Sequence, residues 1–413
     1  MQFKLLQTYK ILSNFAISLI MEFIPFIILD NARESFGLWK ALMIMFGYWA
    51  LQNLFVVIFH KIFKKQYFKR PQLFLLLRII PIVLCEICII FLATNNIFVI
   101  MLTAIFSGME ISFNYVPVDI IYNYVSEGED EKTLGFTRFL EQAGYFVAGI
   151  CGGLFLDYIN PLAVVIFSLI AFVGSAIPLF VFYFKFKNSP NFNTDFICSI
   201  AAKEEQSEQY QKLKKSYLRK HFVTNLLLAP MIDSFYYLAS TVIYLKTTSY
   251  FVEGLVNSLY DGLYGLSCLL IGKLLTKVDG KNYATIAGLA MIVASVAVVF
   301  APNMWIACTA FVFCAIIRPF VLLHLYQEFL DKGRILGVGN DVVMDQSVAE
   351  YISYSISYVA GVFGGLLIPT TIVTAAMALV GVFVARHTEK STTEDLVDYL
   401  EKNENKDANY SRQ

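Results

Sequence analysis

Carboxylates placed inside long apolar runs are the residues of this chain with the clearest chemical potential. Glu22 and Asp30 lie in the first such run, and their eight-residue separation would put them on one face of a helix, about 12 Å apart. A carboxylate removed from water takes up a proton more readily than one in water, and in its ionised form it attracts a cation. Exchange of a proton for a cation is therefore the chemistry that these residues favour. The other acids in apolar runs are Glu86, Glu110, Glu141, Asp233, Asp261 and Glu350.

Only two arginines, Arg138 and Arg318, are expected to oppose these acids at a comparable depth. Arg138 precedes Glu141 by three residues, so the two can pair on one helix, either as a fixed ion pair or as a gate. Arg318 needs an acidic partner, for which Asp233 and Asp261 are the candidates, and that pair can equally be fixed or movable. Because the acids outnumber the arginines, some acids must be protonated, paired with other groups or exposed to a water-filled cavity.

The composition indicates what surrounds these residues. Of the 413 residues, 57% are hydrophobic and 15% are charged, against roughly 25% charged in a soluble domain. The mean hydropathy is +0.62. Lipid must therefore replace water over much of the surface, so we expect an integral membrane protein in contact with a bilayer. The formal net charge of +0 gives no reason to expect a nucleic acid partner.

The sequence lacks the motifs of enzymatic and cofactor chemistry. There is no Gly-rich phosphate loop ending in Lys-Ser or Lys-Thr, no His-Glu-x-x-His and no Gly-x-Ser-x-Gly, so an ATP-driven pump or a membrane hydrolase has no support. Cys85 and Cys88 lack the second Cys or His pair that a four-ligand metal site needs. We predict a protein that is not an enzyme, uses no cofactor or metal, and draws its energy from an ion gradient.

The apolar runs have the length of membrane-spanning helices. A bilayer core of ~30 Å needs ~20 helical residues, and about twelve runs reach that length. The sequence therefore predicts an all-α integral membrane fold. The expected spans are residues 11–30, 36–59, 73–93, 97–123, 134–157, 161–184, 221–245, 251–275, 283–301, 304–327, 343–367 and 371–387.

Lysine and arginine alternate along the expected loops in a pattern that predicts orientation. They gather after the second, sixth, eighth and tenth spans and are absent from the turns after the third, fifth, ninth and eleventh. Cytoplasmic loops carry the excess of these residues. We expect a multi-pass protein of the cell (inner or plasma) membrane with both termini in the cytoplasm, whose first apolar run is a span and not a removable signal.

The longest connection divides the expected spans into two groups of six. Near the end of the chain, Ser391 and Glu394 have the spacing of a capping box, which predicts the start of a soluble C-terminal helix. The expected domains are an N-terminal six-helix bundle (1–184), a cytoplasmic linker with a surface helix (185–220), a C-terminal six-helix bundle (221–387) and a cytoplasmic tail (388–413).

A short segment of the first half recurs in the second half. Val147–Leu154, VAGICGGL, returns as Val359–Leu366, VAGVFGGL, with each copy inside an apolar run. Such a repeat is typical of a transporter built from two related bundles with the substrate path between them. Glycines at these positions let helices of opposing bundles pack closely. The expected packing glycines are Gly144, Gly149, Gly153, Gly361 and Gly365.

Twelve spans in two groups of six, a basic central connection and cytoplasmic termini resemble the major facilitator superfamily over nearly the whole chain. Glycines of the fifth span, Gly144 to Gly153, resemble a motif of proton-driven exporters in that family. Glu22 followed by Asp30 resembles the acid pair in the first span of bacterial drug/proton antiporters, which implies a substrate or proton-coupling role for both. The resemblance further implies a central cavity that Glu22, Glu110, Asp233 and Arg318 face, with Asp261, Glu141 and Glu350 close by.

Together these observations predict a secondary active transporter that acts as a monomer. Its expected function is export of an amphiphilic or cationic small molecule by alternating access, in exchange for protons or another coupling ion. Aromatic rings between Phe235 and Tyr264 could hold an organic cation. The alternatives are a proton-symport importer of a polar nutrient, a lipid flippase and, outside transport, a membrane scaffold or sensor. An importer would use polar side chains such as Asn14, Asn114, Asn225 and Asn257.

Overall fold

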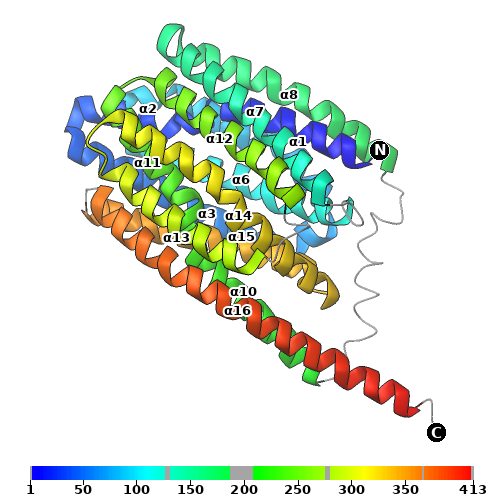
Figure 1. The fold of residues 1–413 in the computed structure, drawn as a ribbon. Coiled ribbons are helices and arrows are strands. Elements are labelled where there is room, and N and C mark those ends of the chain that lie inside the picture. The colour runs from blue at the N-terminus through cyan, green and yellow to red at the C-terminus, as the bar shows by residue number, and fades with distance from the viewer. Residues whose placement is uncertain (1, 126–130, 187–207, 275–279, 365–366, 411–413) are drawn as a thin grey trace.

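The protein is built from helices, as a computed structural model shows (Figure 1). The structure describes residues 2–125, 131–186, 208–274, 280–364 and 367–410, and every regular element within these ranges is helical. In chain order these elements are α1 (Gln2–Ser18), η1 (Met21–Phe23), α2 (Ile24–Phe36), α3 (Leu38–Lys69), α4 (Pro71–Leu77), α5 (Ile79–Ile90), η2 (Leu92–Thr94), α6 (Ile97–Val125), α7 (Glu131–Tyr158), α8 (Pro161–Phe186), α10 (Glu208–Ala229), η4 (Pro230–Ser234), α11 (Phe235–Thr247), α12 (Tyr250–Leu274), α13 (Gly280–Val299), α14 (Met304–Ile335), α15 (Gly339–Gly364) and α16 (Leu367–Tyr410).

The predicted all-α membrane fold is confirmed. Among the described residues, nine helical segments are long and apolar enough to cross a membrane, judged by length and composition. The other three expected spans fall on α10 to α11, on α13 and on α15. The reasons differ: the segment on α13, Ala284–Val299, is apolar but short, whereas α15 carries the acids Asp341, Asp345 and Glu350.

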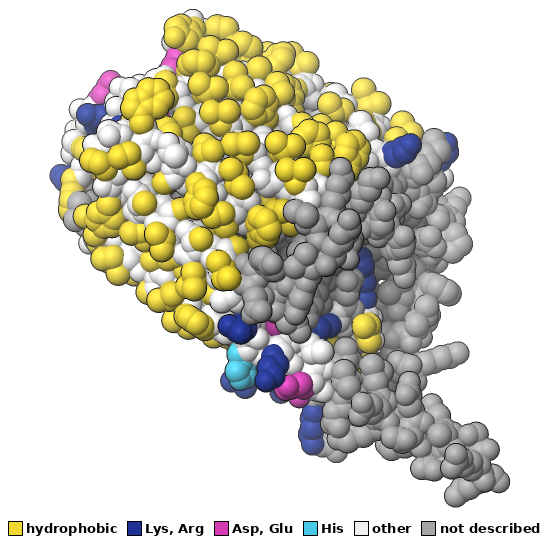
Figure 2. Space-filling model, viewed as in Figure 1, with side chains coloured by type: hydrophobic (Ala, Val, Ile, Leu, Met, Phe, Trp, Pro, Cys, Tyr) yellow, Lys and Arg dark blue, Asp and Glu magenta, His cyan; other side chains and the backbone are white. Residues whose placement is uncertain are grey.

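The distribution of exposed apolar side chains indicates that the middle of the molecule faces lipid. Figure 2 shows apolar side chains over most of the described part of one face, with charged side chains at its left, right and lower margins. Large apolar residues such as Ile170, Ile177 and Val293 expose 65%, 65% and 70% of their surface. An apolar band of this extent is stable against lipid and unfavourable against water.

Two helix pairs join the N-terminal half (α1 to α8) to the C-terminal half (α10 to α16). α7 packs along α12, and α3 packs along α15. The first copy of the sequence repeat lies on α7, and residues 359–364 of the second copy lie on α15, so each copy contributes to one of these two contacts. The ends of the bundle differ in charge, because α3 and α10 carry Lys61, Lys64, Lys214 and Lys215 at one of them. We call this the basic end and the opposite end the far end.

A proline divides the first span and places Glu22 in the break. Pro25 cannot donate a hydrogen bond to the carbonyl of Met21, and its ring clashes with that carbonyl. α1 accordingly ends at Ser18, and the short 3-10 turn η1 leads into α2. Glu22 lies in η1, so the expected regular helix through Glu22 and Asp30 is interrupted between them.

Prolines also disturb the helices at two other polar residues. Pro81 lies four residues after Leu77, where α4 ends, and Arg78 occupies the junction with α5. Pro230 opens the π-helical turn η4, which holds Asp233. Turns of this kind often mark functional positions.

The C-terminal part of the chain differs from the prediction. α16 runs from Leu367 to Tyr410 without a break, so Ser391 does not begin a new helix. Its hydroxyl donates to the carbonyl of Thr388 within the same helix. No proline or glycine lies between Val382 and Ser391 to end the span, so the helix continues through the expected capping box. The expected surface helix of the linker falls largely on residues 187–207, outside the described residues.

Candidate functional site

A cavity of about 320 Å³ lies between the two halves. Its walls come from α1, η1, α3, α6 and α7 in the N-terminal half and from η4, α11, α12, α14 and α15 in the C-terminal half. Tyr115, in the wall on α6, keeps 42% of its surface exposed, so the cavity has room for solvent or a ligand. Lys10, Asp119 and Val343 extend its lining from the middle of the bundle toward the basic end.

Contacts between the halves close the cavity at the far end. Asp30 of α2 accepts hydrogen bonds from the hydroxyls of Tyr244 and Tyr250, the second of them at 2.8 Å. Asp157, at the end of α7, accepts from the backbone N–H groups of Tyr250 at 3.1 Å and Phe251 at 2.9 Å. It thereby satisfies free N–H groups at the start of α12. Asp30 therefore belongs to this closure and not to the cavity lining.

Glu22 and Asp261 face the cavity from opposite halves. Glu22 comes from the break in the first span and Asp261 from the middle of α12. The two carboxylates interact electrostatically, and neither forms an ion pair within the described part of the chain. Ser18 is the hydrogen-bonding neighbour of Glu22. These two acids are therefore available to a positively charged ligand.

Arg318 of α14 pairs with Asp233 of η4, one of its two predicted partners. Their Nη2 and Oδ1 atoms are 3.0 Å apart, and Tyr354 of α15 donates to the other carboxylate oxygen at 2.9 Å. The guanidinium also lies 4.8 Å from the ring centre of Tyr264 on α12, a cation–π distance. This group joins four elements of the C-terminal half at the cavity wall.

Arg138 pairs with Glu141, as expected, but Glu141 has a second cationic partner. The Arg138–Glu141 distance is 3.0 Å, and Lys10 of α1 approaches the other carboxylate oxygen at 2.9 Å. Lys10 was not expected to contribute, because it precedes the first apolar run by sequence. Its side chain nevertheless lines the cavity, so the charge of Glu141 is balanced within the N-terminal half.

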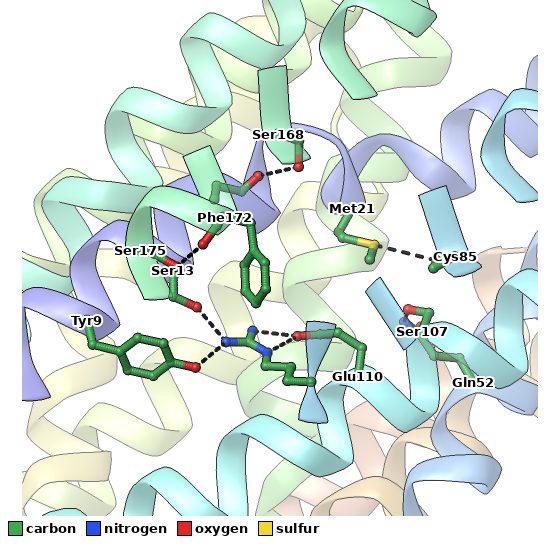
Figure 3. Close-up of polar contacts among 12 residues, drawn as sticks. Tyr9, Ser13, Met21, Gln52, Cys85, Ser107, Glu110, Ser168, Phe172 and Ser175 are labelled. Atoms are coloured by element: carbon green, nitrogen blue, oxygen red, sulfur yellow. Dashed lines mark hydrogen bonds and ion pairs between the residues drawn. The ribbon is translucent and has the colours of Figure 1, made fainter. Parts of the chain in front are cut away.

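Glu110 does not face the cavity, and the reason is an arginine that the sequence analysis overlooked. Arg78, at the α4–α5 junction, forms an ion pair with Glu110, and its Nη1 atom is 3.1 Å from the hydroxyl of Tyr9. Figure 3 shows Glu110, Tyr9 and Ser13 converging on this guanidinium. Both partners of the pair are almost completely buried. The assumption that only Arg138 and Arg318 oppose the acids is therefore wrong.

Glu350 of α15 lines the cavity together with Asp119 of α6. Gln346, one turn earlier on α15, donates to the Glu350 carboxylate at 2.9 Å. Asp119 was not singled out by sequence because it lies close to the end of its span. The two acids add negative charge nearer the basic end than Glu22 and Asp261 do.

Aromatic rings form much of the remaining wall. Trp49 of α3 stacks with Tyr358 of α15 at 5.2 Å and contacts Tyr237 of α11 at 5.3 Å between ring centres. Tyr236 packs edge-on against Tyr260 at 5.1 Å. All except Tyr260 line the cavity. Rings and unpaired carboxylates together suit an organic cation.

Two of the expected packing glycines lie where α7 meets α12. A Cβ atom on Gly149 would come within 2.9 Å of the carbonyl oxygen of Gly254, and one on Gly153 within 2.5 Å of the carbonyl oxygen of Tyr250. A side chain at either position would therefore force the halves apart. These close approaches are those that glycine permits in membrane helices.

The other expected glycines have different surroundings. A Cβ atom on Gly144 would meet the carbonyl oxygen of Ile11 at 2.8 Å, so Gly144 packs α7 against α1 of its own half and not against the opposing half. A Cβ atom on Gly361 would meet Phe46 of α3 at 2.7 Å. Gly365 lies outside the described residues.

Sequence reasoning also missed Glu253, a fully buried acid on α12. It lies near the start of its helix, where acids are common, and so gave no signal. The part of the chain that the structure describes has no cluster of three or more His, Cys, Asp or Glu side chains arranged to hold a metal ion.

Comparison with known proteins identifies the family. Residues 10–344 match the model of the Major Facilitator Superfamily, whereas no curated protein matches the chain. Many solved structures share its fold. A bacterial homologue of the iron transporter ferroportin, in an outward-facing state, is 11% identical, with 95% of this chain and 100% of that chain covered and a TM-score of 0.64.

A second solved structure is the human organic anion transporter MFSD10 (TETRAN), which is 10% identical, with 93% and 98% of the two chains covered and a TM-score of 0.59. A third, a D-xylose–proton symporter, is 12% identical, with 93% and 96% covered and a TM-score of 0.63. Identities this low establish the fold and leave the substrate open. The family match over most of the chain establishes more: this protein belongs to the Major Facilitator Superfamily, as a multi-pass membrane transporter of small molecules and not an enzyme.

Proposed function

We propose that the protein exports an amphiphilic or cationic small molecule in exchange for protons, by alternating access. The observation that carries this proposal is the pair Glu22 and Asp261. Both line the central cavity from opposite halves, and neither has an ion-pair partner among the described residues. Buried acids without partners are costly in a membrane protein unless they bind a cation or a proton.

The mechanism follows from competition for these carboxylates. When both are ionised, the cavity attracts a cation, and the surrounding tyrosine and tryptophan rings hold its apolar parts. When a proton occupies either acid, that attraction weakens and the cation leaves. Because the two acids belong to different halves, their occupancy also changes the electrostatic energy of bringing the halves together, which links binding to alternating access.

The charge distribution supports an orientation in the membrane. The positive-inside rule favours a cytoplasmic location for the basic end, toward which the cavity extends, and for both termini. The structure would then be a cytoplasm-facing state ready to load an exported substrate, with Asp30 in the outer closure. We further propose a monomer in the cell membrane, with bundles at 1–184 and 221–387, a linker at 185–220 and a cytoplasmic tail at 388–413.

Proton movement in inside-out vesicles tests this proposal. Lipophilic cations such as tetraphenylphosphonium are added to vesicles that hold a pH gradient, and a pH-sensitive dye reports proton release. We expect release from wild-type vesicles and none from Glu22→Gln. The matched control is Glu86→Gln, which alters a buried acid outside the cavity lining, bonded to Ser168 at 2.7 Å, and should behave as wild type. If the wild type responds to no cation in the panel, the export proposal is wrong.

Proton-driven import of a polar nutrient is the second candidate. It is favoured by the amides in the cavity wall, Asn14, Asn53 and Asn114, which suit hydroxyl or amine groups. Asn225 and Asn257 are not in that wall, and Asn225 bonds to His221 instead. Uptake of labelled sugars and amines into right-side-out vesicles would reveal this activity.

A further inference from the structure

A further buried acid, Glu253, lies outside the cavity lining, near the contacts that close the far end. Glu253 is one turn inside α12 and is 0% exposed. Asn257 donates a hydrogen bond to its Oε1 atom and accepts one from Ser240 of α11 at 2.7 Å. The Oε2 atom of Glu253 has no hydrogen-bond partner within the described residues. Glu253 does not line the cavity.

The position of Glu253 connects the cavity to the contact between the halves. The neighbouring Gly254 packs against the backbone of Gly149 on α7, and a Cβ atom on it would meet the ring of Phe23 at 3.0 Å. Phe23 directly follows Glu22. On the other side, Tyr250 joins Glu253's helix to Asp30. Glu253 is thus sealed only while α7, α12 and the Asp30 cluster remain together.

The ionisable groups near Glu253 are two acids and a tyrosine, and none of them is cationic. The ionisable groups that interact with it electrostatically are Glu22 from η1, Asp261 from its own helix and Tyr236 from α11. No cationic group among the described residues contributes to its environment. An ionised carboxylate with an unsatisfied oxygen and two acidic neighbours is strongly disfavoured, so the sealed state requires a proton on Glu253.

We propose that Glu253 is a proton-carrying site that couples opening of the far end to cation binding at Glu22 and Asp261. Opening the far end exposes Glu253 to water, from which its carboxylate takes a proton. Closure then seals the protonated group. A cation that binds at Glu22 and Asp261 cancels the negative charge that holds the proton. Once water from the cavity reaches Glu253, its O–H bond breaks and that water accepts the proton.

This inference rests on the proposed function, and proton counting separates the two. Purified protein in weakly buffered detergent is titrated with tetraphenylphosphonium while bound cation and released protons are both measured. We expect Glu253→Gln to bind the cation but to release fewer protons per cation than the wild type, by the amount a single carboxyl accounts for. Glu86→Gln, which also neutralises a buried acid with one unpaired oxygen, should match the wild type.

The outcomes are distinct. If wild-type protein does not bind tetraphenylphosphonium, the proposed function fails. If Glu253→Gln binds it and releases as many protons as the wild type, only the inference about Glu253 fails. It also fails if the folded variant, judged by a single symmetric peak on size exclusion, no longer binds the cation, because Glu253 would then belong to the binding site.

A measurement on the unmodified chain covers the case in which Glu253→Gln does not fold. Dicyclohexylcarbodiimide reacts with protonated carboxyl groups in apolar surroundings, and mass spectrometry locates the adduct. We expect an adduct on Glu253 that decreases when tetraphenylphosphonium is bound. No adduct on Glu253, or one that the cation leaves unchanged, would overturn the inference.

Discussion

At the scale of single residues, the distinction between paired and unpaired acids decides what the cavity can bind. Asp233 and Glu141 are neutralised by Arg318, Arg138 and Lys10. Glu22 and Asp261 have no ion-pair partner among the described residues, and in the proposed mechanism they bind the ligand. A count of acids in the sequence could not separate these two groups, because pairing depends on which helices meet.

The Arg78–Glu110 pair gives the first prediction at this scale. Arg78→Met leaves Glu110 buried without its cation, and breaking a buried ion pair from one side costs about 3–5 kcal/mol. We expect a clear fall in the thermal unfolding temperature in detergent. The double variant Arg78→Met/Glu110→Leu should recover most of the loss, since an apolar pair replaces an ionic one.

The same double variant tests the place of Glu110 outside the cavity. Because Glu110 is absent from the cavity wall, Arg78→Met/Glu110→Leu should bind tetraphenylphosphonium with wild-type affinity in calorimetric titration. A folded double variant that has lost binding would show that Glu110 contacts the substrate after all.

The contacts of residues at helix breaks were the hardest to predict from sequence. Arg78 was overlooked because it lies in an apolar run shortly after a basic loop, where it resembles an orienting charge. Pro81, three residues later, breaks the helix and turns Arg78 inward toward Glu110. The prolines were visible, but the partner that each break would meet depends on the neighbouring helices.

At the scale of elements, apolar length predicted where helices occur and repeated glycines predicted where the halves touch. The repeat on α7 and α15 lies at contacts between the halves, as the spacing of small residues suggested. Sequence periodicity could not place Gly144, which faces α1, because a helix that touches neighbours on several sides has small residues toward more than one of them.

The α7–α12 contact provides a prediction at this scale. Gly254→Val would drive a side chain into the backbone of Gly149, so the far end should no longer close fully. Spin labels at the exposed residues Tyr158 and Thr248 should move farther apart in Gly254→Val, as measured by pulsed electron paramagnetic resonance.

Gly174→Val is the matched control for this experiment, because a Cβ atom there meets nothing within 4 Å. Its label distance should equal that of the parent protein. An unchanged distance in Gly254→Val would mean that this glycine contact does not hold the far end closed.

At the scale of the whole molecule, the closed far end and the cavity extending toward the basic end correspond to one state of the proposed alternating-access cycle. Aspartates make the closing contacts: Asp30 binds two tyrosines and Asp157 caps α12. Sequence alone predicted the all-α transporter fold, because lipid demands long apolar helices. It could not predict which state the chain adopts, since that depends on contacts between residues far apart in the sequence.

The most direct test of the account is whether Glu22 and Asp261 bind one cation together. Tetraphenylphosphonium affinity would be measured by calorimetry for the wild type, Glu22→Gln, Asp261→Asn and the double variant. We predict that each single variant loses about tenfold or more in affinity, and that the double variant loses less than the sum of the two, because residues that share one ligand are not additive. Wild-type affinity in both single variants would contradict the account.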